Sequence, residues 1–288
     1  MAQEKNKIEE STLYLVATPI GNLADISERA LKVLTECDFV AAEDTRNSLK
    51  LLTALGIRNE LISYHEHNKH QSGERIVARL LAGESCALIT DAGMPAISDP
   101  GEDIVRLCAD AGIKVSVIPG ACAAVSALSV SGLPTSRFVF EGFLPVQKGE
   151  RQKRLDALSG EMRTVIFYEA PHKLLNTLTA LRDAFGEDRR ISLCREITKL
   201  NEEVQRCTLG EAVKIYTERE PRGEYVLVMD GASESCRSAD SDELLTLTPE
   251  EHIQRYIDEG LSRMDAIKRA AKDRGVSKSE LYKLVAND

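Results

Sequence analysis

The sequence predicts an α/β protein with two domains and a small helical unit at its carboxyl end. Short apolar stretches alternate with helix-forming stretches through the first 120 residues, which is typical of βαβ units around a buried parallel sheet. The pattern continues to about residue 231 with more antiparallel character. The length of 288 residues agrees with two domains of roughly 150 residues each.

In the first half, each strand is followed by a loop and a helix. Asp25, with Glu28 three residues later, has the spacing of a capping box that opens the first helix. Asp99 and Pro100 start another helix, because proline suits a first turn, and Gly112 suits its end. The expected strands are 13–17, 39–42, 61–64, 85–90 and 114–118. The expected helices are one that opens at Asp25 and includes Leu34, and then 46–55, 72–82, 99–111 and 121–130.

The second half predicts strands at 137–143, 163–168, 190–196, 202–209 and 224–230, with helices at 149–159, 172–185 and 210–218. After Gly231 the chain is polar and poor in large apolar residues, as linkers are. Three further helices begin near Thr248, near residue 263 and at Ser277, and Gly275 ends the second of them. We therefore expect a flexible lead over 1–11, α/β domains over 12–120 and 121–231, a linker over 232–248 and a helix-turn-helix-like unit over 249–288.

Composition narrows the classes of function. The seven cysteines have no metal-binding or redox spacing, which favours reduced thiols, and no apolar run is long enough to span a membrane. We therefore expect a cytoplasmic protein with no membrane partner. The net charge of −9 disfavours non-specific binding to nucleic acid, so any RNA contact needs a local basic patch. Residues 147–154 form such a patch, although a solvated helix start explains the same run.

Six loops follow strands at positions where parallel α/β sheets bind ligands, and they are rich in Gly, Pro, Asp and Thr. No loop carries GxGxxG or a Walker pattern, which disfavours an NAD enzyme or a polyphosphate ligand. Asp91 suits ribose hydroxyls or a cation, and the helix start near 121–123 suits a carboxylate. S-adenosylmethionine is one of several ligands that fit. The loops are 18–22, 43–46, 90–101, 119–124, 168–172 and 195–199.

Seven motifs follow one another along the chain in a fixed order and spacing: LVATPIGNLADIS, AAEDTR, LITDAGMPAISDPG, VIPGACAAVSALSVSGLP, FEGFLP, RTVIFYEAPHKLL and CREITK. They resemble the motifs of the bacterial small-subunit (16S) ribosomal RNA 2′-O-methyltransferase family, a branch of the tetrapyrrole methylase superfamily. The resemblance covers about residues 12–231 and continues into the helical unit.

The resemblance implies two dissimilar α/β domains with a cleft between them, in a homodimer. It implies S-adenosylmethionine bound in that cleft and methyl transfer to the ribose 2′-oxygen of a cytidine in the decoding region. Met94 and Cys122 depart from the commoner family residues, but their neighbours are in place. The expected cofactor-binding residues are Asp91, Ala92, Gly93, Met94, Ile97, Cys122, Ala123, Tyr168 and Ala170.

A weakly acidic ribose hydroxyl needs a base or a nearby cation as its proton leaves. Lys199 could stabilise the developing alkoxide, or act as base if burial lowered its pKa, and Glu43 could accept the proton or orient the ribose. An ion pair between these two side chains is the structural alternative. The expected RNA-binding residues are Asn22, Arg46, Lys148, Arg151 and Arg154.

Several alternatives stay open. Asn22 also suits a helix cap, and Tyr168 suits the core as well as stacking. His65, His67 and His70 are best interpreted as a polar loop, with an RNA contact or a metal site as alternatives, but nothing else in the sequence supports a metal and the proposed chemistry needs none. The rival functions are a tetrapyrrole-type small-molecule methyltransferase and a catalytically silent RNA-binding assembly factor. We expect the assembled 30S subunit as substrate, because the target hydroxyl requires folded RNA around it.

Overall fold

The computed structural model describes residues 7–232, 246–258, 260–274 and 276–285. The chain divides into two compact units. The first, Met1–Ala157 with Thr164–Asp230, holds both β-sheets, and the second, Leu158–Arg163 with Gly231–Asp288, holds three helices. Most of the expected linker, residues 233–245, lies outside the described residues.

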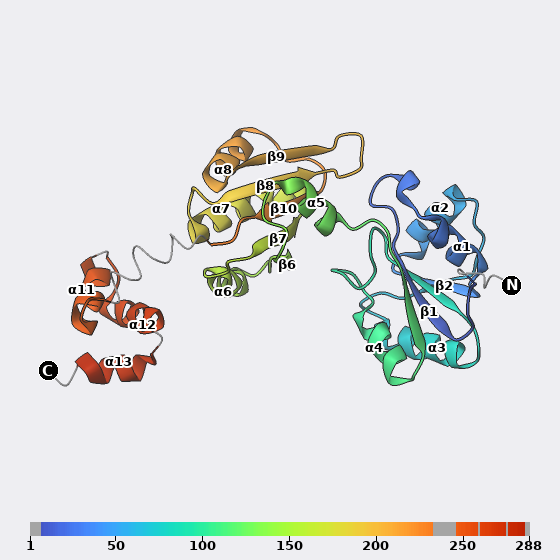
Figure 1. The fold of residues 1–288 in the computed structure, drawn as a ribbon, viewed down its shortest axis with the longest axis horizontal. Helices are drawn as coiled ribbons and strands as arrows, with labels where there is room; N and C mark the ends of the chain where they lie inside the picture. The colour runs from blue at the N-terminus through green and yellow to red at the C-terminus, as the bar shows by residue number, and fades with distance from the viewer. Residues whose placement is uncertain (1–6, 233–245, 259, 275, 286–288) are drawn as a thin grey trace. The chain divides into compact units, whose positions relative to one another are not determined.

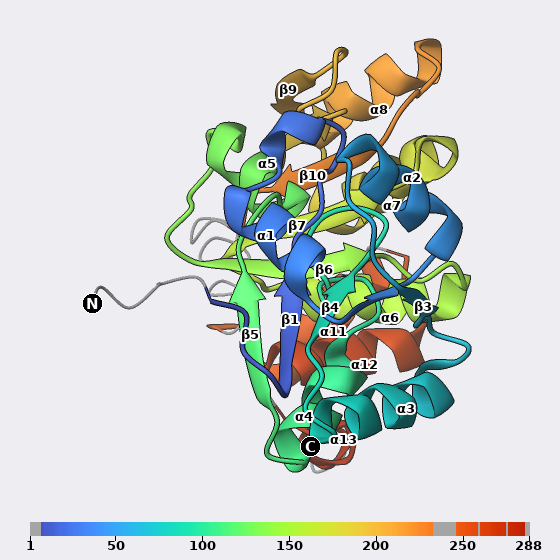
Figure 2. The ribbon, with the colours of Figure 1, turned by 90° about the vertical axis from the view of Figure 1, so that its right-hand side faces the viewer.

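The first sheet is parallel throughout, as the sequence predicts. Its strands run in the order β3-β2-β4-β1-β5, and each neighbouring pair is parallel. β5 lies beside β1 at one edge (Figure 2). The strands are β1 (Thr12–Val16), β2 (Phe39–Ala42), β3 (Leu61–Ser63), β4 (Cys86–Ile89) and β5 (Lys114–Ile118).

Helices cover both faces of this sheet. In Figure 1, α1 (Glu28–Glu36) and α2 (Thr45–Ala54) lie above the strands, and α3 (Lys69–Leu81) and α4 (Glu102–Asp110) lie below them. Alternate residues of each strand join opposite cores, since side chains point to the two faces in turn. Val16 packs with α1, whereas Leu13 packs with α3 and α4. All strands except the edges are therefore apolar on both faces.

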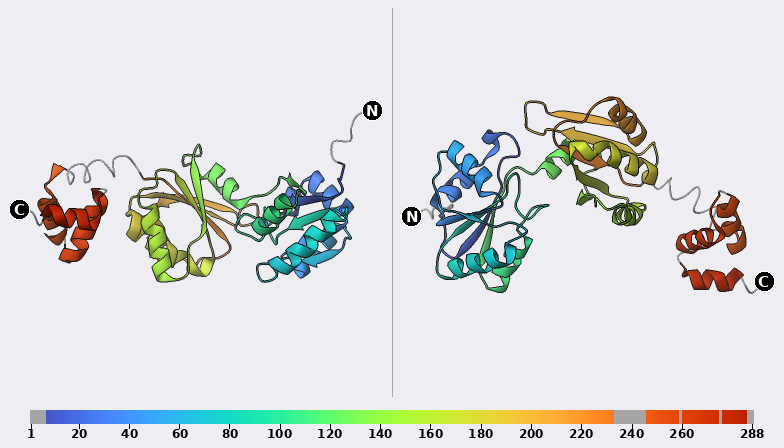
Figure 3. Two further views of the ribbon diagram at one scale, coloured as in Figure 1. Left: turned by 90° about the horizontal axis from the view of Figure 1, so that it is seen from below. Right: turned by 180° about the vertical axis from the view of Figure 1, so that it is seen from behind.

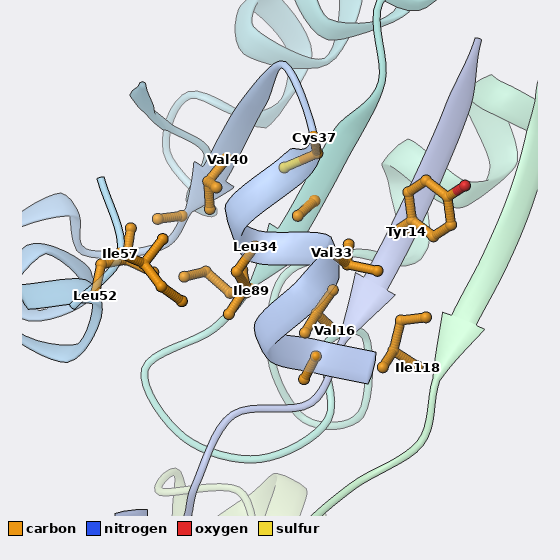
Figure 4. Close-up of a cluster of buried hydrophobic side chains, with 13 residues drawn as sticks. Tyr14, Val16, Val33, Leu34, Cys37, Val40, Leu52, Ile57, Ile89 and Ile118 are labelled. Atoms are coloured by element: carbon orange, nitrogen blue, oxygen red, sulfur yellow. The ribbon is translucent and has the colours of Figure 1, made fainter. Parts of the chain in front are cut away.

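Replacing Leu34 with alanine should destabilise the first unit by about 2–5 kcal/mol, because it leaves a cavity in a close-packed core. Leu34 is fully buried between α1 and the sheet (Figure 4). Urea unfolding of the full chain measures the change. Leu49→Ala, on an exposed part of α2, is the matched control and should cost little. A Leu34→Ala variant as stable as that control would contradict the packing described here.

Two helix starts differ from the sequence predictions. α1 is capped by Ser27, whose hydroxyl accepts from the Ala30 N–H, and not by Asp25. Asp25 instead ends a short 3₁₀ turn, η1 (Leu23–Asp25). α4 begins after Gly101, so Asp99 and Pro100 belong to the preceding loop. Neither Asp25 nor Asp99 therefore caps a helix start.

The second sheet is mixed, with strand order β6-β7-β10-β8-β9. β6 pairs with β7 in parallel, and the other pairs are antiparallel. The sequence prediction of greater antiparallel character in the second half is therefore confirmed. The strands of this sheet are coloured green to orange in Figure 3. The strands are β6 (Phe138–Phe143), β7 (Thr164–Glu169), β8 (Arg190–Arg195), β9 (Glu203–Thr208) and β10 (Tyr225–Met229).

The helices of the second half agree with the predicted ranges to within about two residues. α5 (Ala123–Ser131) packs its small residues Ala124 and Ala127 against β7, β8 and β10. Small side chains let this helix approach the sheet closely. The other helices are α6 (Lys148–Leu158), α7 (Leu174–Phe185), which follows the turn η2 (Pro171–Lys173), and α8 (Leu209–Glu218).

The second unit contains the three expected helices, α11 (Pro249–Asp258), α12 (Arg263–Asp273) and α13 (Lys278–Val285). Ser277 and Glu280 form the predicted capping box, since each side chain bonds the other's backbone N–H. Gly275, the expected end of the second helix, lies outside the described residues. None of the described helices is long and apolar enough to cross a membrane, and the six described cysteines are free thiols.

A buried histidine makes this helical unit sensitive to acid. His252 is fully buried, and its Nδ1 accepts from Arg274 Nε at 3.1 Å, so the ring is neutral. Burial, and then the nearby Arg274 charge, lower the pKa of His252 below 6.5. The unfolded chain therefore binds the extra proton more readily, and the stability is present above pH 6.5 and is lost as pH falls through the folded pKa.

Hydrogen exchange of the full chain should therefore show faster exchange in α11 and α12 at pH 5 than at pH 7.5, after correction for intrinsic rates. His67→Gln, at an exposed position, is the control and should leave this difference unchanged. Equal protection of the two helices at both pH values would contradict the prediction.

Candidate active site

The loops 18–22 and 90–101, which follow the carboxyl ends of strands β1 and β4, are joined by backbone hydrogen bonds. The Thr18 N–H donates to the Gly93 carbonyl at 2.9 Å, and the Gly93 N–H donates back at 3.1 Å. The Thr18 hydroxyl donates to the carbonyl of Thr90. Gly93 has φ +85°, and a Cβ there would lie 3.3 Å from Ile20. Glycine is therefore required where the 18–22 and 90–101 loops meet.

Strained backbone is concentrated in the 90–101 loop and the 195–199 loop. Among the described non-glycine residues, positive φ occurs at Ser11 and at four positions in these loops: Ala96, Ser98, Glu196 and Thr198. Each such residue costs of order 1–3 kcal/mol, and such strain clusters at ligand-binding sites. The 90–101 and 195–199 loops are therefore the segments that the fold holds in unfavourable conformations.

The same two loops line a pocket of about 520 Å³, here called the loop pocket. Its volume lies within the ~300–1,000 Å³ range of small-molecule sites. The wall is mainly apolar and carries a few acidic and basic groups. The lining residues are Ile20, Ala92, Gly93, Met94, Ile97, Ser98, Asp99, Cys122, Ala123, Phe143, Tyr168, Glu169, Ala170, Pro171, His172, Cys194, Glu196, Ile197, Lys199, Glu224, Tyr225 and Val226.

Lys199 is held in the pocket wall by two carboxylates. Its Nζ donates to Glu196 Oε1 at 3.0 Å and to Glu224 Oε2 at 2.8 Å. Burial lowers the pKa of Lys199, but the bonds to Glu224 and Glu196 outweigh burial and raise it overall. Lys199 therefore stays an ammonium ion. The interpretation of Lys199 as a base with a lowered pKa is wrong, and the alternative of an ion pair between Lys199 and Glu43 does not form.

The lysine side chain also crosses the first loop. A Cβ on Gly21 would lie 2.4 Å from Lys199 Cγ, so only glycine leaves room for the stem. The neighbouring Thr198 hydroxyl donates to the Asp25 carboxylate, which ties the 195–199 loop to η1. The position of Lys199 thus depends on loops from both sheets.

Three carboxylates gather at the ends of β2 and β4. Glu43 is partly buried, and burial, followed by the Asp91 charge, raises its pKa. Asp91 is exposed and accepts from Asn47 Nδ2 at 3.0 Å. Neither residue lines the pocket, whereas Asp99 does. Burial, followed by the charges of Glu43 and Asp91, raises the pKa of Asp99 to about 6.

Tyr168 serves both the core and the pocket. Its ring packs edge-on against Phe140 and Phe143, with centroids 5.0 and 5.7 Å away. Its hydroxyl accepts from the Ala124 N–H at 3.2 Å, which caps the start of α5. The tyrosine therefore fixes the helix end next to Cys122 while one part of the ring faces the pocket.

The expected RNA-binding residues lie outside the pocket wall. The Asn22 side chain accepts from the Ala24 N–H, so it caps η1. Arg46 is exposed in the first turn of α2. Lys148 and Arg151 lie on α6, as does Arg154, which pairs with Glu141 at 2.5 Å. Each of these assignments as an RNA contact stays a prediction.

Most of the expected cofactor residues lie together in the pocket. Eight of the nine line it, and the exception is Asp91. Sequence reasoning missed Asp99 as a site residue, because its place before Pro100 indicated a helix start. The sequence places Glu196 three residues before Lys199, which allows the two side chains to pair, but it gives no sign that Glu224 also pairs with Lys199. Among the described residues, including His65, His67 and His70, no group of three metal-ligating side chains is arranged to hold a metal.

Comparison with known proteins identifies the class. The sequence model of the tetrapyrrole (corrin/porphyrin) methylase family matches residues 12–213 of this chain. Among solved structures, the uroporphyrin-III C-methyltransferase of Thermus thermophilus complexed with S-adenosyl homocysteine superposes with a TM-score of 0.54 at 18% identity, covering 78% of this chain and 99% of that one. Diphthine synthase superposes with a TM-score of 0.57 at 15% identity, covering 76% and 90%. The chain belongs to the tetrapyrrole methylase family.

Closer relatives define the branch. The ribosomal RNA small subunit methyltransferase I of Halalkalibacterium halodurans is 47% identical over 278 residues, covering 96% of this chain and 95% of the relative. That of Bacillus subtilis is 46% identical over 276 residues, covering 96% and 94%. Within the tetrapyrrole methylases, the chain is a member of the ribosomal RNA small subunit methyltransferase I family.

Proposed function

We propose that this protein transfers a methyl group from S-adenosylmethionine to the ribose 2′-hydroxyl of a cytidine in the decoding region of 16S rRNA. The observation that carries the proposal is the loop pocket, in which Lys199 shares a wall with the 90–101 loop. The names of the relatives support ribosomal RNA as the substrate. The finer details, namely the ribose 2′-hydroxyl, the cytidine and the decoding region, rest on the resemblance of the motifs.

The pocket fits the cofactor in size and chemistry. Its mainly apolar wall suits the adenine and the methionine chain. S-adenosylmethionine supplies an electrophilic methyl group on a good leaving group. We assign its binding to the nine expected residues, eight in the wall and Asp91 beside it.

The protein's main tasks are positioning and charge stabilisation. The Lys199 ammonium, held by Glu196 and Glu224, stabilises negative charge as it develops on the ribose oxygen. Glu43 lies beside Asp91 and outside the pocket wall, so the proposal for it is to orient the ribose or its loop.

RNA binding is proposed for groups outside the pocket wall. α6 presents Lys148, Arg151 and Arg154, and Arg46 and Asn22 lie near the first sheet's loops. Basic side chains on an otherwise acidic protein direct phosphate to a defined surface. We further propose that the protein acts in the cytoplasm, as a homodimer, on the assembled 30S subunit.

Labelled methyl transfer tests the function. Purified protein is incubated with labelled S-adenosylmethionine and three acceptors: protein-free rRNA, intact 30S subunits and porphyrin precursors. We expect transfer to 30S subunits, with 2′-O-methyl mapping to a decoding-region cytidine that loses its mark in cells lacking the protein. Faster transfer to protein-free rRNA would contradict the 30S substrate. Transfer only to porphyrin precursors, or no binding of the cofactor by calorimetry, would overturn the proposal.

A further inference from the structure

The loop pocket contains few groups that can accept a proton. Its wall carries four carboxylates and one imidazole: Asp99, Glu169, Glu196, Glu224 and His172. Methyl transfer to a hydroxyl releases one proton, so one of these groups, or water, must take it. Their hydrogen bonds separate the four carboxylates.

Three of the carboxylates are already engaged. Glu169 is buried, and it accepts from the Thr177 hydroxyl at 2.5 Å and from the Ala170 N–H at 2.8 Å. Glu196 and Glu224 both accept from the Lys199 ammonium. A proton placed on either of the last two would weaken the contacts that hold Lys199.

Asp99 has no such engagement. No hydrogen bond or ion pair joins its carboxylate to another described side chain, and the charges that act on it come from Glu43 and Asp91. Across the pocket, the Tyr168 hydroxyl lies near enough for Asp99 to raise its pKa. Asp99 therefore faces the cavity with its acceptor oxygens available.

The backbone holds Asp99 in place. Ser98, the residue before it, has φ +68°, and the Ala96 N–H donates to the Pro100 carbonyl at 3.3 Å, closing a tight loop around Asp99. A Cβ on Gly101 would lie 2.9 Å from Ala96, so this loop is packed against its own end. A strained loop that fixes a free carboxylate at a pocket wall is typical of catalytic positions.

We propose that Asp99 is the general base of the reaction, a role that rests on the proposed function. As the ribose oxygen bonds the methyl carbon, the carbon–sulfur bond breaks and its electron pair stays on sulfur. The hydroxyl proton passes to the Asp99 carboxylate, which later releases it to solvent. Lys199 stabilises the oxygen from the second sheet's loop while Asp99 removes its proton from the first sheet's loop.

The acidity of Asp99 suits this role. Burial, followed by the charges of Glu43 and Asp91, raises its pKa to about 6, nearer to neutral pH than that of an ordinary aspartate. A base is most effective when its pKa lies close to the working pH while it is still ionised. As the pH falls below about 6, an increasing fraction of the carboxylate is protonated and cannot accept the proton.

The test compares Asp99→Asn with Asp103→Asn, the same change at an ion-paired residue of α4 outside the pocket. Single-turnover transfer to 30S subunits at pH 7.5 should fall by about 10²–10⁴-fold in Asp99→Asn and stay near wild type in Asp103→Asn. The wild-type rate should rise tenfold per pH unit below about pH 6 and then level off. This rise should be absent in Asp99→Asn.

Two measurements do not depend on activity. Carboxyl ¹³C NMR of the cofactor-free protein should show one aspartate titrating near pH 6, and the signal should be missing in Asp99→Asn. Calorimetry should give S-adenosylmethionine affinities of the two proteins within about threefold of each other.

Three outcomes would overturn the role of Asp99. They are a near-normal rate in Asp99→Asn, a loss of activity explained by lost cofactor affinity, and a pH limb that persists in Asp99→Asn but disappears in His172→Asn. Absence of transfer by the wild type instead overturns the proposed function, so the two failures are distinguishable.

Discussion

Replacing Lys199 with alanine will lower the rate of methyl transfer by about 10²–10³-fold, the effect of removing one preorganised group that stabilises developing negative charge. The Lys199 ammonium is fixed by Glu196 at 3.0 Å and by Glu224 at 2.8 Å, so it needs no reorganisation during the reaction. Because these bonds raise its pKa, it keeps its charge throughout the neutral range. Cofactor affinity should change little.

The measurement is single-turnover transfer to 30S subunits, with cofactor affinity determined by calorimetry. Lys114→Ala is the control, because Lys114 is an exposed residue of β5 that pairs with Glu9. We expect the control to transfer methyl at the wild-type rate. Near-normal turnover in Lys199→Ala would remove Lys199 from the catalytic residues.

Replacing Gly21 with alanine should lower transfer by about 10²-fold, the cost of moving a catalytic group by about 1 Å. The new Cβ would lie 2.4 Å from Lys199 Cγ and 2.8 Å from Cε, so the lysine stem must move. The backbone at Gly21, with φ +152°, adds strain for any other residue.

Gly83→Ala separates strain from displacement. Gly83 also has positive φ, but a Cβ there meets nothing within 4 Å. This control should lose some stability and keep its transfer rate. A double variant adds a sharper test: if Gly21→Ala acts through Lys199, combining it with Lys199→Ala should give no further loss. Additive losses would show that Gly21 acts by another route.

The secondary structure was largely predictable because strands and helices each carry their own periodicity. Both sheets, the small-residue helix α5 and the three carboxyl-terminal helices follow the sequence expectations. The errors fall at Asp25 and Asp99, two acidic residues that local rules assign to helix starts. Asp25 accepts from Thr198 and Asp99 faces the pocket, and both placements depend on residues distant in sequence.

The site was predictable in its loops and less so in its side-chain partners. Parallel strands bring their carboxyl ends to one edge, so the 18–22 and 90–101 loops were expected together, and Thr18 and Gly93 join them. The alternative ion pair of Lys199 with Glu43 does not form. Glu196 and Glu224 take that position because β8 and β10 are neighbours in the second sheet.

By itself, the sequence determined the order of strands and helices, the parallel character of the first sheet and the loops that carry the chemistry, since these depend on local pattern and on family motifs. The tertiary structure alone decided that Lys199 stays protonated and that Asp99 acquires a pKa of about 6. The physical reason is that acidity depends on burial and on nearby charges, and those come from residues brought together only by folding.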